Sequence, residues 1–220
     1  MPTPRAPDAI LFDLDGTLVD TVPARIDAWL AALEEFGIPS SRSALEPMIG
    51  MDGRQLAREL AAAAGRSLTD EEAEAIDRRS GELFDELNRD PRPLPGAREL
   101  LRDLDERGLT WAIATSSRRD QVTASIAALG LAEEPGIVDG SRVERAKPAP
   151  DLLLLGAREL GADPDACWYV GDSTWDMRAA RAAGMVAIGV LAGAAVDEAA
   201  LRDAGAASVV PNLGDLELPG

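Results

Sequence analysis

Histidine is absent from this chain of 220 residues, and its absence removes several kinds of chemistry at once. A Ser-His-Asp triad, a His-ligated zinc site and histidine acid/base catalysis all need an imidazole ring, so none of them can operate here. If the protein is an enzyme, carboxylates have to carry the proton transfers.

Cysteine and long hydrophobic runs are equally scarce. Cys167 is the only cysteine, which excludes an internal disulfide and fits a reducing compartment; beside an apolar run, it is expected to be a small core residue. No apolar run approaches the roughly 20 residues of a membrane span, and residues 1–7 lack the hydrophobic segment of a signal peptide. We therefore expect a cytoplasmic protein that does not enter a membrane.

Positive charge is in short supply. The chain has 39 acidic and 22 basic residues, and its net charge of −17 argues against binding to nucleic acid or an anionic membrane surface. A small anionic substrate stays possible, because a metal ion and a few cations can reverse the field inside a cleft. Lys147 is the only lysine among many arginines, which indicates a place where a compact ammonium is specifically required.

The first informative motif of the sequence is a short acidic one near its start. Residues 9–12 form an apolar run that predicts a buried strand, and Asp13 and Asp15 follow it directly. Because residues i and i+2 of a strand point to the same side, the two carboxylates are expected to converge at its carboxyl end, with Gly16 and Thr17 turning the chain. Two like charges there call for a neutralising partner, and Mg²⁺, which prefers oxygen ligands, is the expected one.

The rest of the chain divides into a helical section and an alternating section. Amphipathic spacing and capping residues predict helices over 23–36, 54–64 (with Asp52 as cap) and from a Thr69 capping box toward Asn88, with no strand between them. Strands then alternate with helices: strands 110–115, 136–139, 167–170, 186–190 and 208–210, helices 97–107, 118–129, 148–160, 174–183 and 196–204. We expect an α/β fold with a doubly wound parallel sheet, a core of residues 1–19 and 92–220, and an inserted all-helical cap of residues 20–91, as a monomer or a homodimer.

Three further signals fall at or just after predicted strands. The predicted strand 110–115 runs into the hydroxyls of Thr115, Ser116 and Ser117, which suit a phosphate group. Lys147 comes directly before a predicted helix. Asp172 follows a third strand, and Asp176 lies four residues later on the first helical turn, so both can reach one metal ion. Each signal also has an ordinary structural reading, as a helix cap, a solvated loop lysine or a carboxylate facing a helix dipole.

Together these motifs resemble all four motifs of the haloacid dehalogenase superfamily, in the branch of phosphatases with a helical cap similar to phosphoglycolate phosphatases. The resemblance covers the whole chain and implies a Rossmann-like core. It implies that Asp13 is a nucleophile that becomes an aspartyl-phosphate, that Asp15 is the general acid/base, and that Thr115, Ser116 and Lys147 bind the phosphoryl group. It also implies that Asp13, Asp172 and the backbone carbonyl of Asp15 hold Mg²⁺, supported by Asp176. The substrate would be a small phosphorylated metabolite, of phosphoglycolate or sugar-phosphate type.

Departures from related patterns narrow the choice. Dehalogenases of the superfamily have an aromatic residue where this chain has Asp15, and phosphonoacetaldehyde hydrolases use a cap lysine that this chain lacks. The similar β-phosphoglucomutases have a histidine where this chain has Arg25, which disfavours a mutase without excluding it. A non-catalytic binding protein that kept the fold is the other alternative. In the cap, Arg25 and Arg54 are the candidate specificity residues.

Overall fold

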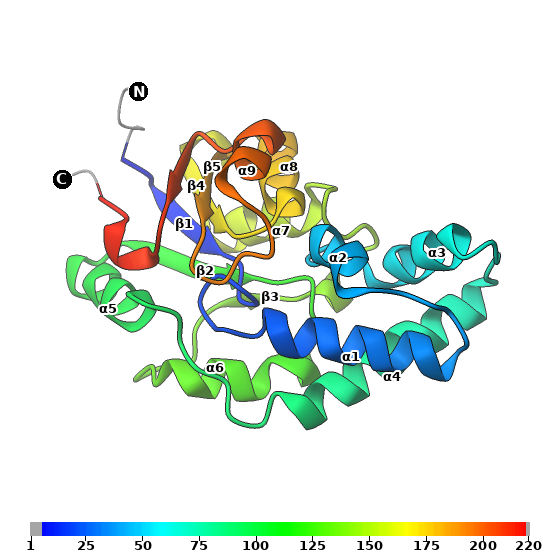
Figure 1. Ribbon diagram of the computed structural model, residues 1–220. Helices are drawn as coiled ribbons and strands as arrows, with labels where there is room; N and C mark the ends of the chain where they lie inside the picture. Colours follow the sequence, from blue (N-terminus) through cyan, green and yellow to red (C-terminus); the bar gives the residue numbers. More distant parts are fainter. Residues whose placement is uncertain (1–5, 219–220) are drawn as a thin grey trace.

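A parallel sheet organises the fold (Figure 1). In the computed structural model, which describes residues 6–218, all strand pairs are parallel and the order is β3-β2-β1-β4-β5-β6. The strands are β1 (Ala9–Phe12), β2 (Thr110–Ala114), β3 (Ile137–Val138), β4 (Cys167–Gly171), β5 (Val186–Val190) and β6 (Ser208–Val210). The chain leaves β1 toward one edge through β2 and β3 and returns to its other side with β4. The order in which the chain adds strands therefore reverses between β1 and β4, and ligands of such sheets bind at this point.

Helices cover both faces of the sheet, as the alternating pattern predicts. On one face lie α7 (Asp151–Leu160), α8 (Thr174–Ala183) and α9 (Glu198–Ala204), where Leu152, Met177 and Leu201 pack with Leu11 of β1. On the other lie α5 (Ala97–Arg107) and α6 (Thr123–Leu129), packed with Phe12 in a second cluster. Because β1 is buried on both sides, its sequence is a continuous apolar run and not an alternating one. The predicted doubly wound α/β sheet is confirmed.

The chain between β1 and α5 is helical, which confirms the predicted insertion. It contains α1 (Val22–Glu35), α2 (Arg42–Leu45), a short 3₁₀ turn (Glu46–Met48), α3 (Gly53–Ala63) and α4 (Asp70–Leu87), and α1 lies along α4 (Figure 1). Its apolar side chains, such as Ile26, Trp29, Leu56 and Ile76, form a hydrophobic cluster of their own. We take this cluster as support for the domain limits at 19/20 and 91/92, which remain a proposal; residues 1–5 and 219–220 of the core assignment lie outside the described residues.

Local capping explains where the cap helices begin. The Asp52 side chain accepts a hydrogen bond from the Gln55 amide at 3.0 Å, which satisfies a free donor at the start of α3. At the start of α4, Thr69 accepts from the Glu72 amide at 3.2 Å, while the Glu72 carboxylate accepts from the Thr69 amide at 2.9 Å. Both predicted caps are confirmed.

Three predicted helices begin later in the structure than the sequence indicates, and one short helix was missed. The predicted helix 118–129 begins as a 3₁₀ turn (Arg119–Val122) before α6, because the Gln121 side chain accepts from the Arg118 amide and caps a tighter turn. The helix predicted from 148 begins only at Asp151, after two prolines, and the one predicted from 196 begins at Glu198, since the Asp197 side chain caps it. The one-turn helix α2 was not predicted, because four residues are too few to show a helical period.

Cys167 is buried in the cluster beneath α7 and α8, and burial raises the pKa of its thiol to about 11, so it is a core residue and not a nucleophile. Between residues 6 and 218, every helix is too short or too polar to cross a bilayer.

Candidate active site

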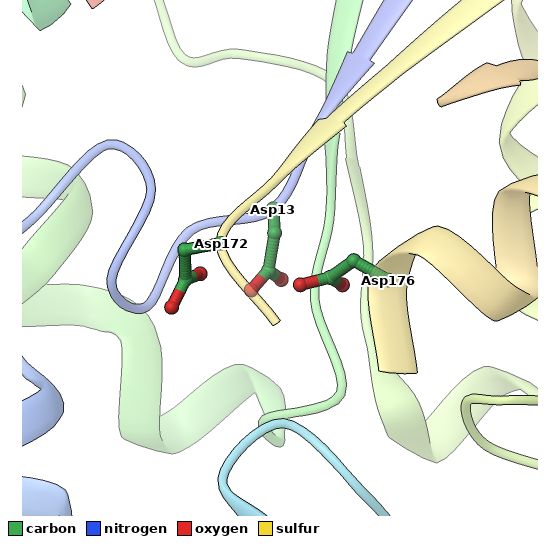
Figure 2. Close-up of side chains that lie close together, drawn as sticks. All are labelled: Asp13, Asp172 and Asp176. Atoms are coloured by element: carbon green, nitrogen blue, oxygen red, sulfur yellow. The ribbon is translucent and has the colours of Figure 1, made fainter. Parts of the chain in front are cut away.

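Three carboxylates converge at the carboxyl ends of β1 and β4 (Figure 2). Asp13 follows β1, Asp172 follows β4, and Asp176 lies on the first turn of α8. One oxygen of each lies within 4.8 Å of the others, and all three side chains are buried. The two strand ends are tied together because the Asp13 amide donates a 2.8 Å hydrogen bond to the carbonyl of Val170. The parallel topology therefore brings together residues that are far apart in the sequence.

Two glycines allow these side chains to approach so closely. Gly16 has a φ of 82°, and a Cβ placed on it would lie 2.4 Å from Oδ2 of Asp172. A Cβ on Gly171 would lie 2.6 Å from the Cβ of Asp176. Since real Cβ atoms do not come that near to another atom, any larger residue at either position would push the carboxylates apart.

Lys147 lies between two of the carboxylates. Its Nζ is 2.8 Å from Oδ1 of Asp13 and 2.8 Å from Oδ1 of Asp176, and the side chain is fully buried. It also lies over the Tyr169 ring, 5.2 Å from the ring centre. The only lysine of the chain is thus a buried ammonium at the centre of the site, and not a solvated loop residue.

Hydrogen bonds from Ser173 and Tyr169 hold the Asp176 carboxylate. The Ser173 hydroxyl donates to its Oδ2 at 2.6 Å, the Ser173 amide donates to the same oxygen at 2.9 Å, and the Tyr169 hydroxyl donates to Oδ1 at 3.2 Å. Its Oδ1 also faces Lys147. We infer that the main task of Asp176 is to fix Lys147, a role that the sequence pattern did not separate from metal binding.

Burial and mutual repulsion govern the electrostatics of the cluster. Burial is the largest influence on Asp13, and although Lys147 opposes it, repulsion from Asp176 and Asp15 helps to raise the pKa of Asp13 to about 7. Burial and repulsion from Asp176 and Asp13 likewise raise the pKa of Asp172 well above its ordinary value. Burial would lower the pKa of Lys147, but attraction to Asp13 and Asp176 outweighs it and raises that pKa. The cluster therefore has an excess of negative charge.

The donor set fits a hard divalent cation. Three carboxylates paired with one ammonium leave two negative charges when all are ionised, and their oxygens lie close enough to share an ion. The Asp15 carboxylate is not a member of this cluster. Metal binding by the backbone carbonyl of Asp15 stays a prediction.

Asp15 is held in a separate network. Thr21 donates to its Oδ1 at 2.7 Å, while Ser117 and Arg25 donate to its Oδ2 at 2.6 Å and 3.1 Å. Burial would raise the pKa of Asp15, but Arg25 and these hydrogen bonds outweigh it and hold that pKa below its ordinary value. In this arrangement Asp15 is an ionised carboxylate, which suits the acceptance of a proton from water; donation to a leaving group first needs a proton on Asp15.

Arg25, a predicted specificity residue, makes contacts within the protein that the sequence did not predict. Besides Asp15, its guanidinium donates to the Ser117 hydroxyl at 2.9 Å and stacks 3.4 Å from the centre of the Phe84 ring. Arg54 is 45% exposed, pairs with Asp52 at 3.2 Å and does not line the cavity beside Asp13. Contact of either arginine with a substrate stays a prediction, but Arg25 has a prior task in positioning Asp15.

We therefore expect Arg25→Ala to slow turnover of every substrate, on the order of 10- to 100-fold, because Asp15 loses a contact that fixes its position. Arg25→Lys should recover part of the loss, since an ammonium can also pair with Asp15. Steady-state assays on a generic aryl phosphate and on metabolite phosphates provide the comparison. Arg54→Ala is the matched control, and equal effects of the two alanine variants would remove Arg25 from this role.

A cavity of about 80 Å³ opens beside Asp13 and Asp15. Thr115 and Ser116 line it at the end of β2, together with Lys147, as the phosphate-binding prediction requires. Helix α4 of the cap also lines it, with Asp77, Ser80 and Gly81. We call this space the inner cavity.

Sequence reasoning missed several residues of the site. Ser117 lies in the predicted hydroxyl motif without a role, yet it contacts Asp15 directly. Thr17 donates to Asp172 at 2.8 Å, and Thr21 donates to Asp15. The signal for Thr17 and Thr21 was their place directly after the acidic motif. Asp77 and Ser80 gave no such signal, because an acid and a serine are ordinary on an amphipathic helix.

Comparisons with known proteins agree with this architecture. The profile of the haloacid dehalogenase-like hydrolases matches residues 7–184. A phosphoglycolate phosphatase of Xanthomonas campestris pv. campestris is 33% identical over 198 residues, covering 86% of this chain and 85% of that protein. Hexitol phosphatase A of Escherichia coli is 36% identical over 181 residues, covering 82% and 81%. The crystal structure of a hydrolase from Pseudomonas syringae, 39% identical, has a TM-score of 0.89 and covers 94% of both chains.

Proposed function

The chain belongs to the haloacid dehalogenase-like hydrolases, and from this premise we propose that it is a Mg²⁺-dependent phosphatase of small phosphomonoesters that works through an aspartyl-phosphate on Asp13. One observation carries the proposal: the Asp13 carboxylate lies at the floor of the inner cavity, held by Lys147 at 2.8 Å and flanked by Asp172. Similarity to a phosphoglycolate phosphatase and a hexitol phosphatase supports the coarser class, a phosphoglycolate- or sugar-phosphate-type substrate.

In the first half-reaction, a carboxylate oxygen of Asp13 attacks phosphorus while the bond from phosphorus to the leaving oxygen breaks. Lys147 holds Oδ1 of Asp13 and thereby orients the second oxygen toward the cavity. Thr115 and Ser116 are placed to bind phosphoryl oxygens. Asp15, once protonated, donates its proton to the leaving oxygen, so the product leaves as a neutral alcohol.

In the second half-reaction, water attacks the aspartyl-phosphate. Asp15 takes a proton from that water, the bond between phosphorus and Asp13 breaks, and inorganic phosphate leaves with Asp13 restored. The lowered pKa of Asp15 suits this step, because it keeps the group ionised as a base. Asp13, Asp172 and the backbone carbonyl of Asp15 would hold Mg²⁺, with Asp176 in support, and the ion when bound would neutralise phosphoryl oxygens.

A mutase is less well supported than a phosphatase. At position 25, where the similar mutases have a titratable histidine, this chain has an arginine, and it pairs with Asp15. A guanidinium stays protonated and cannot pass a proton to and fro. Product analysis separates the two, because a phosphatase releases inorganic phosphate and a mutase returns an isomeric sugar phosphate.

We expect metal removal to abolish activity. Protein stripped with a chelator should release phosphate from p-nitrophenyl phosphate at the background rate, and added Mg²⁺ should restore the release, because the excess negative charge around Asp13 otherwise repels the phosphoryl group. The measurement is phosphate release against Mg²⁺ concentration. Full activity in excess chelator would contradict the metal requirement, and no activity under any condition would favour the binding protein.

A further inference from the structure

Helix α4 presents a polar face to the inner cavity. Asp77, Ser80 and Gly81 all line it, because residues three and four apart lie on the same side of a helix. From the core, Gln121 faces them: a Cβ on Gly81 would lie 1.9 Å from its Nε2, so a larger residue there would displace the Gln121 side chain. Asp77, Ser80 and Gly81 line the cavity from the cap, whereas Thr115 and Lys147 line it from the core, and the leaving group of a substrate bound to Asp13 would project toward the cap.

The Ser80 hydroxyl has no partner among the described residues. Its side chain is buried, with 1% of the residue exposed, and its Oγ makes no hydrogen bond there. A buried hydroxyl without a partner is unfavourable, and such groups in folded proteins usually bond to another group. Because Ser80 lines the inner cavity, a molecule in that cavity can supply the partner. This points to a hydroxyl-bearing ligand.

The charges on the same side of the cavity disfavour an anionic leaving group. Asp77 lines the inner cavity, is 24% exposed and accepts a hydrogen bond from Arg118 at Oδ2. Among the residues that line the inner cavity, Arg25 and Lys147 are the cations, and both are already paired with aspartates. A carboxylate on the leaving group would meet Asp77 and find no unpaired cation there.

Building on the phosphatase function proposed above, we propose that Asp77 and Ser80 select an uncharged, polyhydroxylated leaving group, a polyol or a sugar, over one that carries a carboxylate. Ser80 recognises a hydroxyl of the leaving group. Asp77 accepts from another hydroxyl and repels a carboxylate. Both are specificity residues and take no part in the chemical step.

The first test compares Ser80→Ala with wild type on a hexitol 6-phosphate and on p-nitrophenyl phosphate. The kcat/KM for the hexitol phosphate should fall about tenfold more than that for the aryl phosphate, which has no hydroxyl to offer. Ser40→Ala is the matched control, because its Oγ is also buried without a partner among the described residues but does not line the inner cavity. Equal losses on both substrates, or the same pattern in Ser40→Ala, would overturn the role of Ser80.

The second test compares Asp77→Asn with Glu74→Gln, using the ratio of kcat/KM for the hexitol phosphate to that for 2-phosphoglycolate. Both variants remove a carboxylate that binds Arg118, but only Asp77 lines the inner cavity. We expect the ratio to fall at least about tenfold in Asp77→Asn and to stay within about twofold in Glu74→Gln. A similar fall in both variants would assign the effect to the release of Arg118 and overturn the role of Asp77.

Assays of the wild-type enzyme distinguish a failure of this inference from a failure of the phosphatase function on which it rests. Failure to hydrolyse p-nitrophenyl phosphate, hexitol phosphate and 2-phosphoglycolate alike would overturn the phosphatase function itself. Hydrolysis of all three with 2-phosphoglycolate preferred would leave that function standing and overturn the selection of neutral leaving groups.

Discussion

Asp13→Asn is expected to abolish phosphatase turnover, with phosphate release from p-nitrophenyl phosphate falling on the order of 10⁴-fold or more. An amide oxygen is a poor nucleophile, so the bond to phosphorus that begins the reaction does not form. Lys147, Asp172 and the inner cavity stay in place, so a substrate can still bind. Single-turnover assays at saturating substrate measure the loss directly.

The same variant should stay folded. Asparagine has nearly the shape of aspartate, and the raised pKa of Asp13 means that the fold disfavours its ionised form. Above that pKa the charge lowers the free energy of unfolding, so a neutral amide removes a cost, while Lys147 keeps its contact with Asp176. We expect an unchanged or higher Tm at pH 8.

Asp20→Asn is the matched control for this experiment. Asp20 lies on the same segment but is exposed and outside the inner cavity, so its turnover should match wild type. If Asp13→Asn turns over near the wild-type rate with its fold intact, Asp13 is not the nucleophile.

Lys147→Arg should be the next most damaging change, with a loss of turnover on the order of 10²- to 10³-fold, although the chain uses arginine almost everywhere else. Lys147 is buried between Asp13 and Asp176 at 2.8 Å from each, with the Tyr169 ring beneath it. A guanidinium is larger and planar, so it cannot occupy the space of a point charge without moving those groups. The kcat on p-nitrophenyl phosphate gives the loss.

Overpacking should also lower the stability of Lys147→Arg, by about 1–3 kcal/mol, which thermal unfolding would measure. Arg145→Lys is the matched control, because it makes the opposite exchange two residues away on the exposed surface. It should change neither kcat nor the free energy of unfolding. Near wild-type kinetics in a folded Lys147→Arg variant would show that the site needs a positive charge but not an ammonium.

Much of the fold follows from local signals. The predicted strand 9–12 and the predicted helices 97–107 and 174–183 have the bounds of β1, α5 and α8 in the structure. Each has a strong local cause: a continuous apolar run for β1, a glycine after the last turn for α5, and both a serine cap and a following glycine for α8. Predictions failed where a single turn decided the boundary, as at α2 and at the start of α7, because side-chain caps and prolines act over distances shorter than one helical period.

The sequence by itself determined which charged groups meet at the candidate site. The type of the neighbouring elements can be predicted from the sequence: Asp13 and Asp172 each follow a strand, and Lys147 precedes a helix. Because the carboxyl ends of parallel strands meet at one edge of the sheet, the topology brings these three residues together. Only the tertiary structure decided which partner each group has. That Arg25 holds Asp15 and that Asp77 and Ser80 line the inner cavity depend on how the helical insertion lies on the sheet, whereas the pairing of Asp176 with Lys147 depends on how α8 lies beside the loop before α7. Such contacts join residues that no periodic pattern links, because side-chain pairing across two packed units is fixed by their relative position and not by either sequence segment alone.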